Sequence, residues 1–61
     1  DAIESCRRAL AIHPRHGAAW NNLGVLLRRQ GDHASARRAF ETALAIDPTH
    51  RQAIDNLEGP E

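Results

Sequence analysis

The side chains that could hold a metal ion or act as nucleophiles are four histidines and one cysteine: His13, His16, His33, His50 and Cys6. His13 and His16 flank a proline, but no cysteine or carboxylate cluster completes a set with zinc-like spacing. A nucleophilic Cys6 would need a nearby base in a cleft, and the sequence provides none. We therefore expect turn histidines on the surface, a buried apolar Cys6, no metal, no cofactor and no catalytic residue. The chain is not predicted to be an enzyme.

Arginine doublets are the second chemical feature, because guanidinium groups bind phosphates and carboxylates. The doublets are Arg7-Arg8, Arg28-Arg29 and Arg37-Arg38, but eight acidic residues balance the eight basic ones. The acidic residues are interleaved with the doublets, and only two aromatic residues are present to stack on bases. We expect neither nucleic acid nor a membrane as a partner. No apolar stretch approaches the roughly 20 residues of a membrane-spanning helix.

An internal repeat of 34 residues organises these positions. After a shift of 34, ten of the 27 overlapping positions are identical without a gap. The segment Ala9 to Ile12 returns as Ala43 to Ile46, and His16 returns as His50. A period of this length is typical of helical repeat arrays.

Apolar residues recur at steps of three and four, which is the spacing of one face of an α-helix. Trp20, Leu23 and Leu27, for example, fall on one stripe. The pattern predicts four helices, at residues 2–12, 18–30, 33–46 and 50–58. Because the connections are only a few residues long, we expect antiparallel neighbours in an all-α stack.

The predicted helix ends have local signals. Breaks are expected at Pro14, Gly31, Pro48 and Gly59-Pro60. Asp32 is expected to cap the third helix. Thr49 is followed three residues later by Gln52, which predicts a capping box at the start of the fourth helix.

The order of large and small residues resembles the tetratricopeptide repeat. The matching residues are Trp20, Leu23, Gly24, Ala36, Phe40, Ala43 and Pro48, with Leu27 where the family has a tyrosine. The resemblance implies an all-α, TPR-like α-solenoid fragment forming a single domain over 1–61. It divides that domain into the second helix of a partial repeat (1–16), a complete repeat (17–50) and the first helix of a following repeat (51–61). Small residues would lie where helices approach closely, and both aromatic residues would fill the core.

The same resemblance implies a concave groove for extended peptides, lined by the first helix of each repeat. The groove residues would be Ala18, Asn21, Asn22, Val25, Arg28, Arg29, Gln52, Asp55 and Asn56. Arg28 and Arg29 could pair with an acidic partner, or could simply suit a helix C-terminus. The family's carboxylate clamp is not evident, because Gln52 and Asn56 stand where it would carry basic groups.

Asn22 and Asn56 lie 34 residues apart and therefore occupy equivalent places on successive repeats. A side-chain amide offers both a donor and an acceptor, so a series of such amides could hold a peptide backbone at regular steps. This arrangement resembles the asparagine ladder of the protein O-linked N-acetylglucosamine transferases. The alternative is that asparagine is a tolerated polar residue on an exposed helix face.

Three functions follow from these patterns. The first is a protein-interaction module that binds a peptide or protein partner in the groove. The second is self-assembly as a homodimer or longer stack through the end helices, because fewer than the roughly three repeats normally needed for a stable array are present. The third is an adaptor segment within a larger enzyme. A single cysteine forms no internal disulfide, which favours a reducing, cytoplasmic location.

Overall fold

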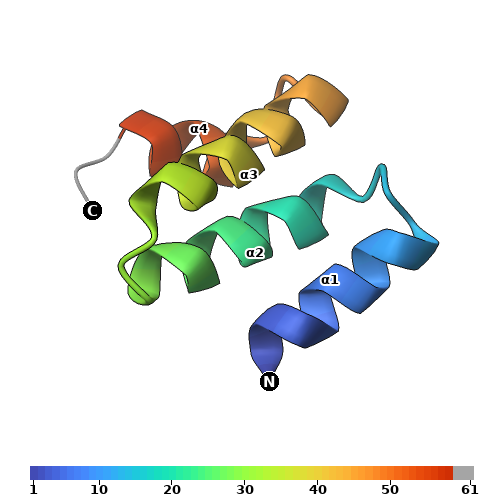
Figure 1. Ribbon diagram of the computed structural model, residues 1–61. Coiled ribbons are helices and arrows are strands. Elements are labelled where there is room, and N and C mark those ends of the chain that lie inside the picture. The colour runs from blue at the N-terminus through green and yellow to red at the C-terminus, as the bar shows by residue number, and fades with distance from the viewer. Residues whose placement is uncertain (59–61) are drawn as a thin grey trace.

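Four α-helices form where the apolar periodicity predicts them. The computed structural model describes residues 1–58, and Figure 1 shows the helices packed as adjacent antiparallel pairs. The helices are α1 (Ala2–Ile12), α2 (Gly17–Arg29), α3 (His33–Ile46) and α4 (Arg51–Glu58). The all-α prediction is confirmed, with α2 and the start of α4 displaced by one residue. The stop predicted at Gly59-Pro60 lies outside the described residues.

Aspartate side chains cap α1 and α3. The Glu4 amide donates to Asp1 Oδ1 at 2.8 Å, and the Ser35 amide donates to Asp32 Oδ1 at 3.2 Å. Each bond satisfies an amide that has no partner within the first helical turn. Gly31 precedes the second cap with φ of 89°, a conformation that L-residues rarely adopt. The predicted turn at Gly31 and the predicted cap at Asp32 are both confirmed.

Histidines cap the other two helices. The Ala19 amide donates to His16 Nδ1 at 3.3 Å, and the Ala53 amide donates to His50 Nδ1 at 3.4 Å. His16 and His50 are one repeat apart, so the repeat preserves the role as well as the residue. Accepting this bond requires an imidazole whose Nδ1 carries no proton. These turn histidines therefore define where α2 and α4 begin.

The predicted capping box at Thr49 is wrong. The Thr49 hydroxyl and amide both donate to Asp47 Oδ1, at 2.8 and 3.1 Å. The hydroxyl is thus used inside the turn, one residue before the cap at His50. The two bonds, first from the hydroxyl and then from the amide, hold the pKa of Asp47 below its ordinary value.

The central helix is α2, which packs against both α1 and α3. Helix α4 packs on α3 and touches α2, whereas α1 and α3 lie on either side of α2 without contact between them in the described part of the chain. The buried core runs through these interfaces. Its main cluster consists of Leu10, Ala19, Leu23, Leu27, Ala36 and Phe40.

The closest approach between helices is at Gly24 of α2, against the Phe40 ring of α3. A Cβ placed on Gly24 would lie 2.5 Å from Phe40 Cε1, closer than real contacts allow. Ala43 and Ala53 are both 0% exposed, so small side chains also set the spacing farther along the stack. The prediction that glycine and alanine permit close helix packing is confirmed.

Trp20 does not fill the core as the repeat pattern predicts. The indole is only half-buried, and its Nε1–H donates to the Pro14 carbonyl at 2.9 Å. That bond anchors the polar edge of the ring at the turn between α1 and α2, and leaves a face of the ring at the surface. Cys6 is also half-buried and packs against the core from α1.

Candidate functional site

The candidate site is a hollow of about 390 Å³ between α2 and α4. Its lining residues are Asn21, Asn22, Val25, Gln52, Asp55 and Asn56. These are six of the nine residues predicted to line the groove; Ala18, Arg28 and Arg29 do not line this hollow. The hollow therefore brings together α2 and α4, whose sequences correspond after the shift of 34 residues.

A chain of side-chain amides joins the two helices across this hollow. Asn56 Nδ2 donates to Asn21 Oδ1 at 2.9 Å, and Asn21 Nδ2 donates to Gln52 Oε1 at 3.3 Å. Arg28 Nη2 donates to Asn56 Oδ1 at 3.5 Å, the longest of the three bonds. The amides of Asn21 and Asn56 both donate and accept in this arrangement, whereas the Gln52 amide accepts. The network therefore holds the orientation of the Asn56 amide.

Asn21 and Asn22 are neighbours in the sequence but differ in burial. Asn21 is 3% exposed and is the buried polar residue of the core, whereas Asn22 is exposed. No other side chain within residues 1–58 hydrogen-bonds to the Asn22 amide. Asn21 is thus an internal support, and Asn22 keeps its donor and acceptor for an outside group. The equivalent residues Asn22 and Asn56 consequently have unequal surroundings.

Arg28 lies beside the hollow, and Arg29 does not. The Arg28 guanidinium stacks over the Phe40 ring, 5.6 Å from the centroid, while it donates to Asn56. Both contacts hold this cation at the edge of the site. Arg29 instead lines a separate hollow with Ile3 of α1. The structure therefore separates the two arginines that the groove prediction grouped.

Asp55 is the acidic group of the hollow. It lies 3.9 Å from Arg51 Nε in an exposed pair, and such pairs contribute little to stability. Val25 adds an apolar surface on the α2 side. The hollow thus offers amides, one carboxylate and one apolar side chain, which suits a polar chain that can both donate and accept hydrogen bonds.

A second hollow, of about 480 Å³, lies on another face of α2 and was not predicted from the sequence. Trp20 and Leu23 form part of its floor, and Arg7 and Arg38 stand on its walls. The repeat pattern predicts Trp20 to be a core residue, but in the structure Trp20 lines this hollow. The arginine doublets were the sequence feature that could have indicated this hollow, because Arg7 and Arg38 belong to two of the three doublets.

Within residues 1–58, no group of three or more histidine, cysteine or acidic side chains is placed to hold a metal ion. The same part of the chain contains no helix with both the length and the apolar character needed to cross a membrane.

Replacing Asn21 by alanine is expected to lower the free energy of unfolding by about 1 kcal/mol, since two interhelical hydrogen bonds are lost. Asn22→Ala is the matched control, because it makes the same chemical change one residue later on an exposed side chain. We expect the control to stay within about 0.5 kcal/mol of the unaltered chain. Urea denaturation followed by circular dichroism measures both. Equal effects would contradict the assignment of Asn21 as the internal support.

Comparison with protein families matches residues 1–51 to the family described as Tetratricopeptide repeat. This match covers more than half of the chain and both arms of the α2–α3 hairpin. The chain belongs to the tetratricopeptide repeat family. Domains of this family are generally protein-interaction modules.

Curated proteins that are similar to this chain come from distant organisms. The chain is 42% identical over 56 residues to Protein O-mannosyl-transferase TMTC1 of Mus musculus, covering 92% of the chain and 6% of that protein. It is 40% identical over 58 residues to Tetratricopeptide repeat protein 8 of Caenorhabditis elegans, covering 92% of the chain and 12% of that protein.

A third relative is a TPR repeat-containing protein of Pseudomonas aeruginosa, 39% identical over 49 residues, with 80% of the chain and 47% of that protein covered. The chain thus spans less than half the length of each of these relatives. No solved structure gives a significant match.

Proposed function

We propose that this tetratricopeptide repeat segment binds an extended peptide in the hollow between α2 and α4, through the side-chain amides of Asn22 and Asn56. The observation that carries the proposal is the hydrogen-bond network in which Asn21 and Arg28 hold the orientation of the Asn56 amide. An amide held in place before binding loses little conformational freedom when a ligand arrives.

The chemistry of the hollow favours recognition of a peptide backbone. Backbone N–H and C=O groups alternate along an extended chain and need both acceptors and donors. Asn22 supplies both from an exposed position, and Asn56 supplies what its internal bonds leave unused. Because the amides address the backbone, we expect broad tolerance of the peptide's side chains.

The proposal assigns binding, and no reaction, to these residues. One relative bears the name of a mannosyl-transferase, but the chain matches only 6% of its length. An adaptor role within a larger enzyme would use the same hollow, so it is compatible with the proposal.

The test is selection of peptides from a random display library on the protein, followed by affinity measurements on the peptides obtained. Asn22→Ala and Asn56→Ala should each lower the affinity for those peptides about tenfold, since each removes a bidentate hydrogen-bonding group from a partly enclosed site. Gln30→Ala is the matched control: it removes an exposed amide at the C-terminal end of α2 that does not line the hollow. Peptides methylated on backbone nitrogens should also bind more weakly.

Unchanged affinity in the double variant Asn22→Ala, Asn56→Ala would overturn the role of the amides. Full binding of backbone-methylated peptides would overturn backbone recognition, even if the hollow proved to be the site.

Self-assembly through the end helices is the alternative, favoured by Ile12, whose side chain is 72% exposed. Half-buried Ile3 and Leu57 also lie on the two end helices. Sedimentation equilibrium over a range of concentrations separates the two functions. A monomer at every concentration supports the peptide-binding role, and a dimer that loses helicity on dilution supports self-assembly.

A further inference from the structure

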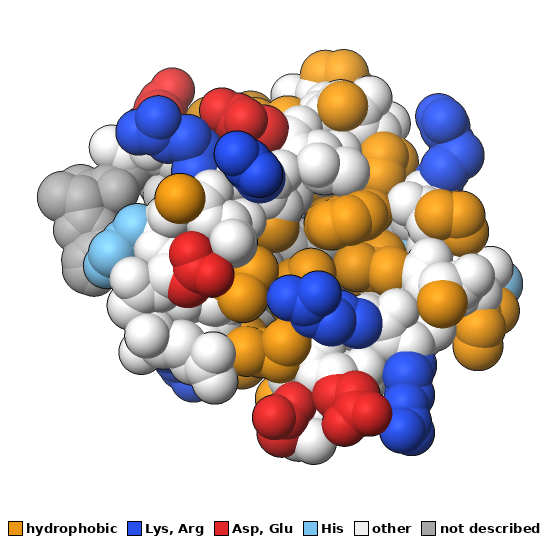
Figure 2. All heavy atoms as spheres, in the orientation of Figure 1, with side chains coloured by type: hydrophobic (Ala, Val, Ile, Leu, Met, Phe, Trp, Pro, Cys, Tyr) orange, Lys and Arg blue, Asp and Glu red, His pale blue; other side chains and the backbone are white. Residues whose placement is uncertain are grey.

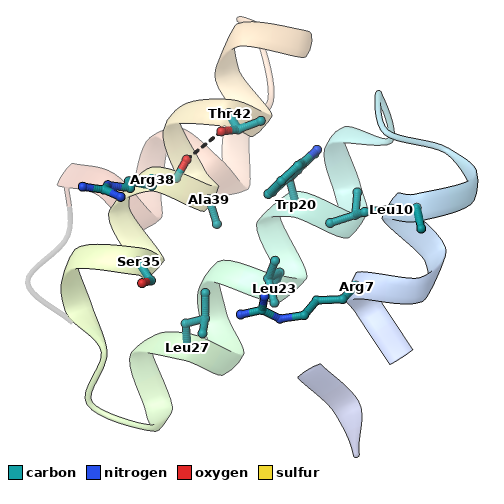
Figure 3. Close-up of a pocket in the computed structure, with 10 residues that line it drawn as sticks. Arg7, Leu10, Trp20, Leu23, Leu27, Ser35, Arg38, Ala39 and Thr42 are labelled. Atoms are coloured by element: carbon teal, nitrogen blue, oxygen red, sulfur yellow. Dashed lines mark hydrogen bonds between the residues drawn. The ribbon is translucent and has the colours of Figure 1, made fainter. Parts of the chain in front are cut away.

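The second hollow, the one lined by Trp20, Leu23, Arg7 and Arg38, is a groove that runs over α2 between α1 and α3. It lies away from the amide hollow between α2 and α4. Figure 3 shows its floor, where Leu10, Trp20, Leu23 and Leu27 converge, and shows the Arg7 side chain extended across it toward Leu23. In Figure 2, hydrophobic side chains gather in the space between α1 and α3, with basic side chains beside them. The groove exists because α1 and α3 both pack on α2 but do not touch each other.

This groove and the α2/α4 hollow use different sides of the same helix. Trp20, Leu23 and Leu27 face the groove, whereas Asn21, Asn22 and Val25 face the hollow. At 3.6 residues per turn, the two sets point about half a turn apart. A ligand in the groove would therefore leave the amide site open.

The charge of the groove has one sign. Arg7 and Arg38 are its charged lining residues, and no acidic side chain of residues 1–58 lines it. Both arginines are exposed, and neither is in an ion pair within residues 1–58, where the pairs formed by arginines are those of Arg8 and Arg51. Cations at the edge of an apolar recess attract acidic ligands more strongly than isolated surface cations do.

The position of Arg7 provides a second argument. Its aliphatic stem extends over the apolar floor while its guanidinium stays unpaired. A ligand that brings both an apolar side chain and a carboxylate could displace the stem from the floor and pair with the guanidinium. A purely apolar ligand could contact only the floor, and a basic ligand could not pair with the guanidinium.

We propose that this groove is a second binding site, for an acidic peptide segment that inserts a large aliphatic or aromatic side chain between α1 and α3 and pairs its carboxylates with Arg7 and Arg38. The inference does not depend on the function proposed for the amide hollow.

The probe is a pool of peptides, each of about eight residues, with a central leucine or phenylalanine and aspartate or glutamate at every other position. A second pool replaces the acids by lysine, and a third replaces the central residue by serine. Trp20 is the single tryptophan of the chain and lies in the groove, so its fluorescence reports binding directly. Amide chemical shifts then map the site.

We expect a saturable change of Trp20 emission with the acidic apolar pool and at most a weak change with the other two. Arg7→Glu and Arg38→Glu should each weaken binding about fivefold or more. Arg37→Glu is the matched control, because it reverses the charge of the neighbouring exposed arginine outside the groove, and it should stay within about twofold. The variant Asn22→Ala, Asn56→Ala should bind the acidic pool normally.

Three results would overturn the proposal. The first is no saturable response to the acidic pool, or an equal response to the lysine pool. The second is an equal loss of affinity in Arg37→Glu and Arg38→Glu, which would indicate charge attraction without a site. The third is Trp20 emission that depends on protein concentration without peptide and loses that dependence in Arg7→Glu, which would assign the groove to a second copy of the chain.

Discussion

Replacing Phe40 by alanine is expected to lower the free energy of unfolding by about 3–5 kcal/mol, the largest loss of any single change proposed here. The ring is 2% exposed and lies against the backbone of α2 at Gly24, so its removal leaves a cavity that the helices cannot easily close. A domain of this size is only marginally stable. The variant should therefore lose most of its helical circular dichroism at 25 °C.

The matched control for Phe40→Ala is Ile12→Ala, which truncates an apolar side chain that is 72% exposed. Surface truncations of this kind change stability by less than about 0.5 kcal/mol. Urea denaturation of both variants and of the milder Phe40→Leu provides the comparison. A loss below 1 kcal/mol for Phe40→Ala, read against the roughly 3 expected, would mean that the ring does not anchor the α2–α3 interface.

Gly24→Ala is expected to lower the free energy of unfolding by about 1–3 kcal/mol, although alanine is the better helix former. The added methyl group would lie 2.5 Å from Phe40 Cε1 and 2.8 Å from Cζ, so the ring or the helix must move. The ring is packed on its other sides and has little freedom to yield. Overpacking therefore outweighs the gain of about 0.5–1 kcal/mol in helix propensity.

Gly17→Ala is the control for this change, because it introduces the same methyl group at the first residue of α2. The nearest atom to that methyl group would be His50 Cδ2 at 3.6 Å, an ordinary van der Waals contact. We expect Gly17→Ala to be neutral or slightly stabilising in thermal denaturation.

A double-mutant cycle then tests the cause. Phe40→Leu makes room at the Gly24 position, so Gly24→Ala should cost less in that background than in the unaltered chain. Strict additivity of the two changes would contradict a direct clash between the methyl group and the ring.

The core and the amide site are physically linked through Arg28. Its guanidinium rests over the Phe40 ring and donates to Asn56. Changes at Phe40 that leave the chain folded should therefore also make the Asn56 side chain less well oriented. Phe40→Leu should lower the affinity for peptides that bind through this amide. Peptide affinity and stability are consequently best measured on the same set of variants.

Features that depend on local interactions can be predicted from the order of residues. The bounds of α1 and α3 follow from apolar periodicity and proline, the turn at Gly31 follows from glycine's access to positive φ, and the cap at Asp32 follows from a short acceptor beside free amides. The close contact at Gly24 was also predictable, because the repeat pattern places a small residue there. Each of these features depends on neighbours within a few residues or on one strong family motif.

The division of the α2 side chains between the hollow and the groove depends on how α1, α3 and α4 pack around α2. Asn21 and Asn22 have the same side chain, but Asn21 is buried and hydrogen-bonds to Gln52 and Asn56 of α4, whereas Asn22 is exposed. Trp20 faces an open groove because α1 and α3 both pack on α2 but not on each other. Thr49 does not cap α4, because its hydroxyl donates a hydrogen bond to Asp47. Burial and hydrogen-bond partners depend on where distant helices lie, and no local pattern in one sequence carries that information.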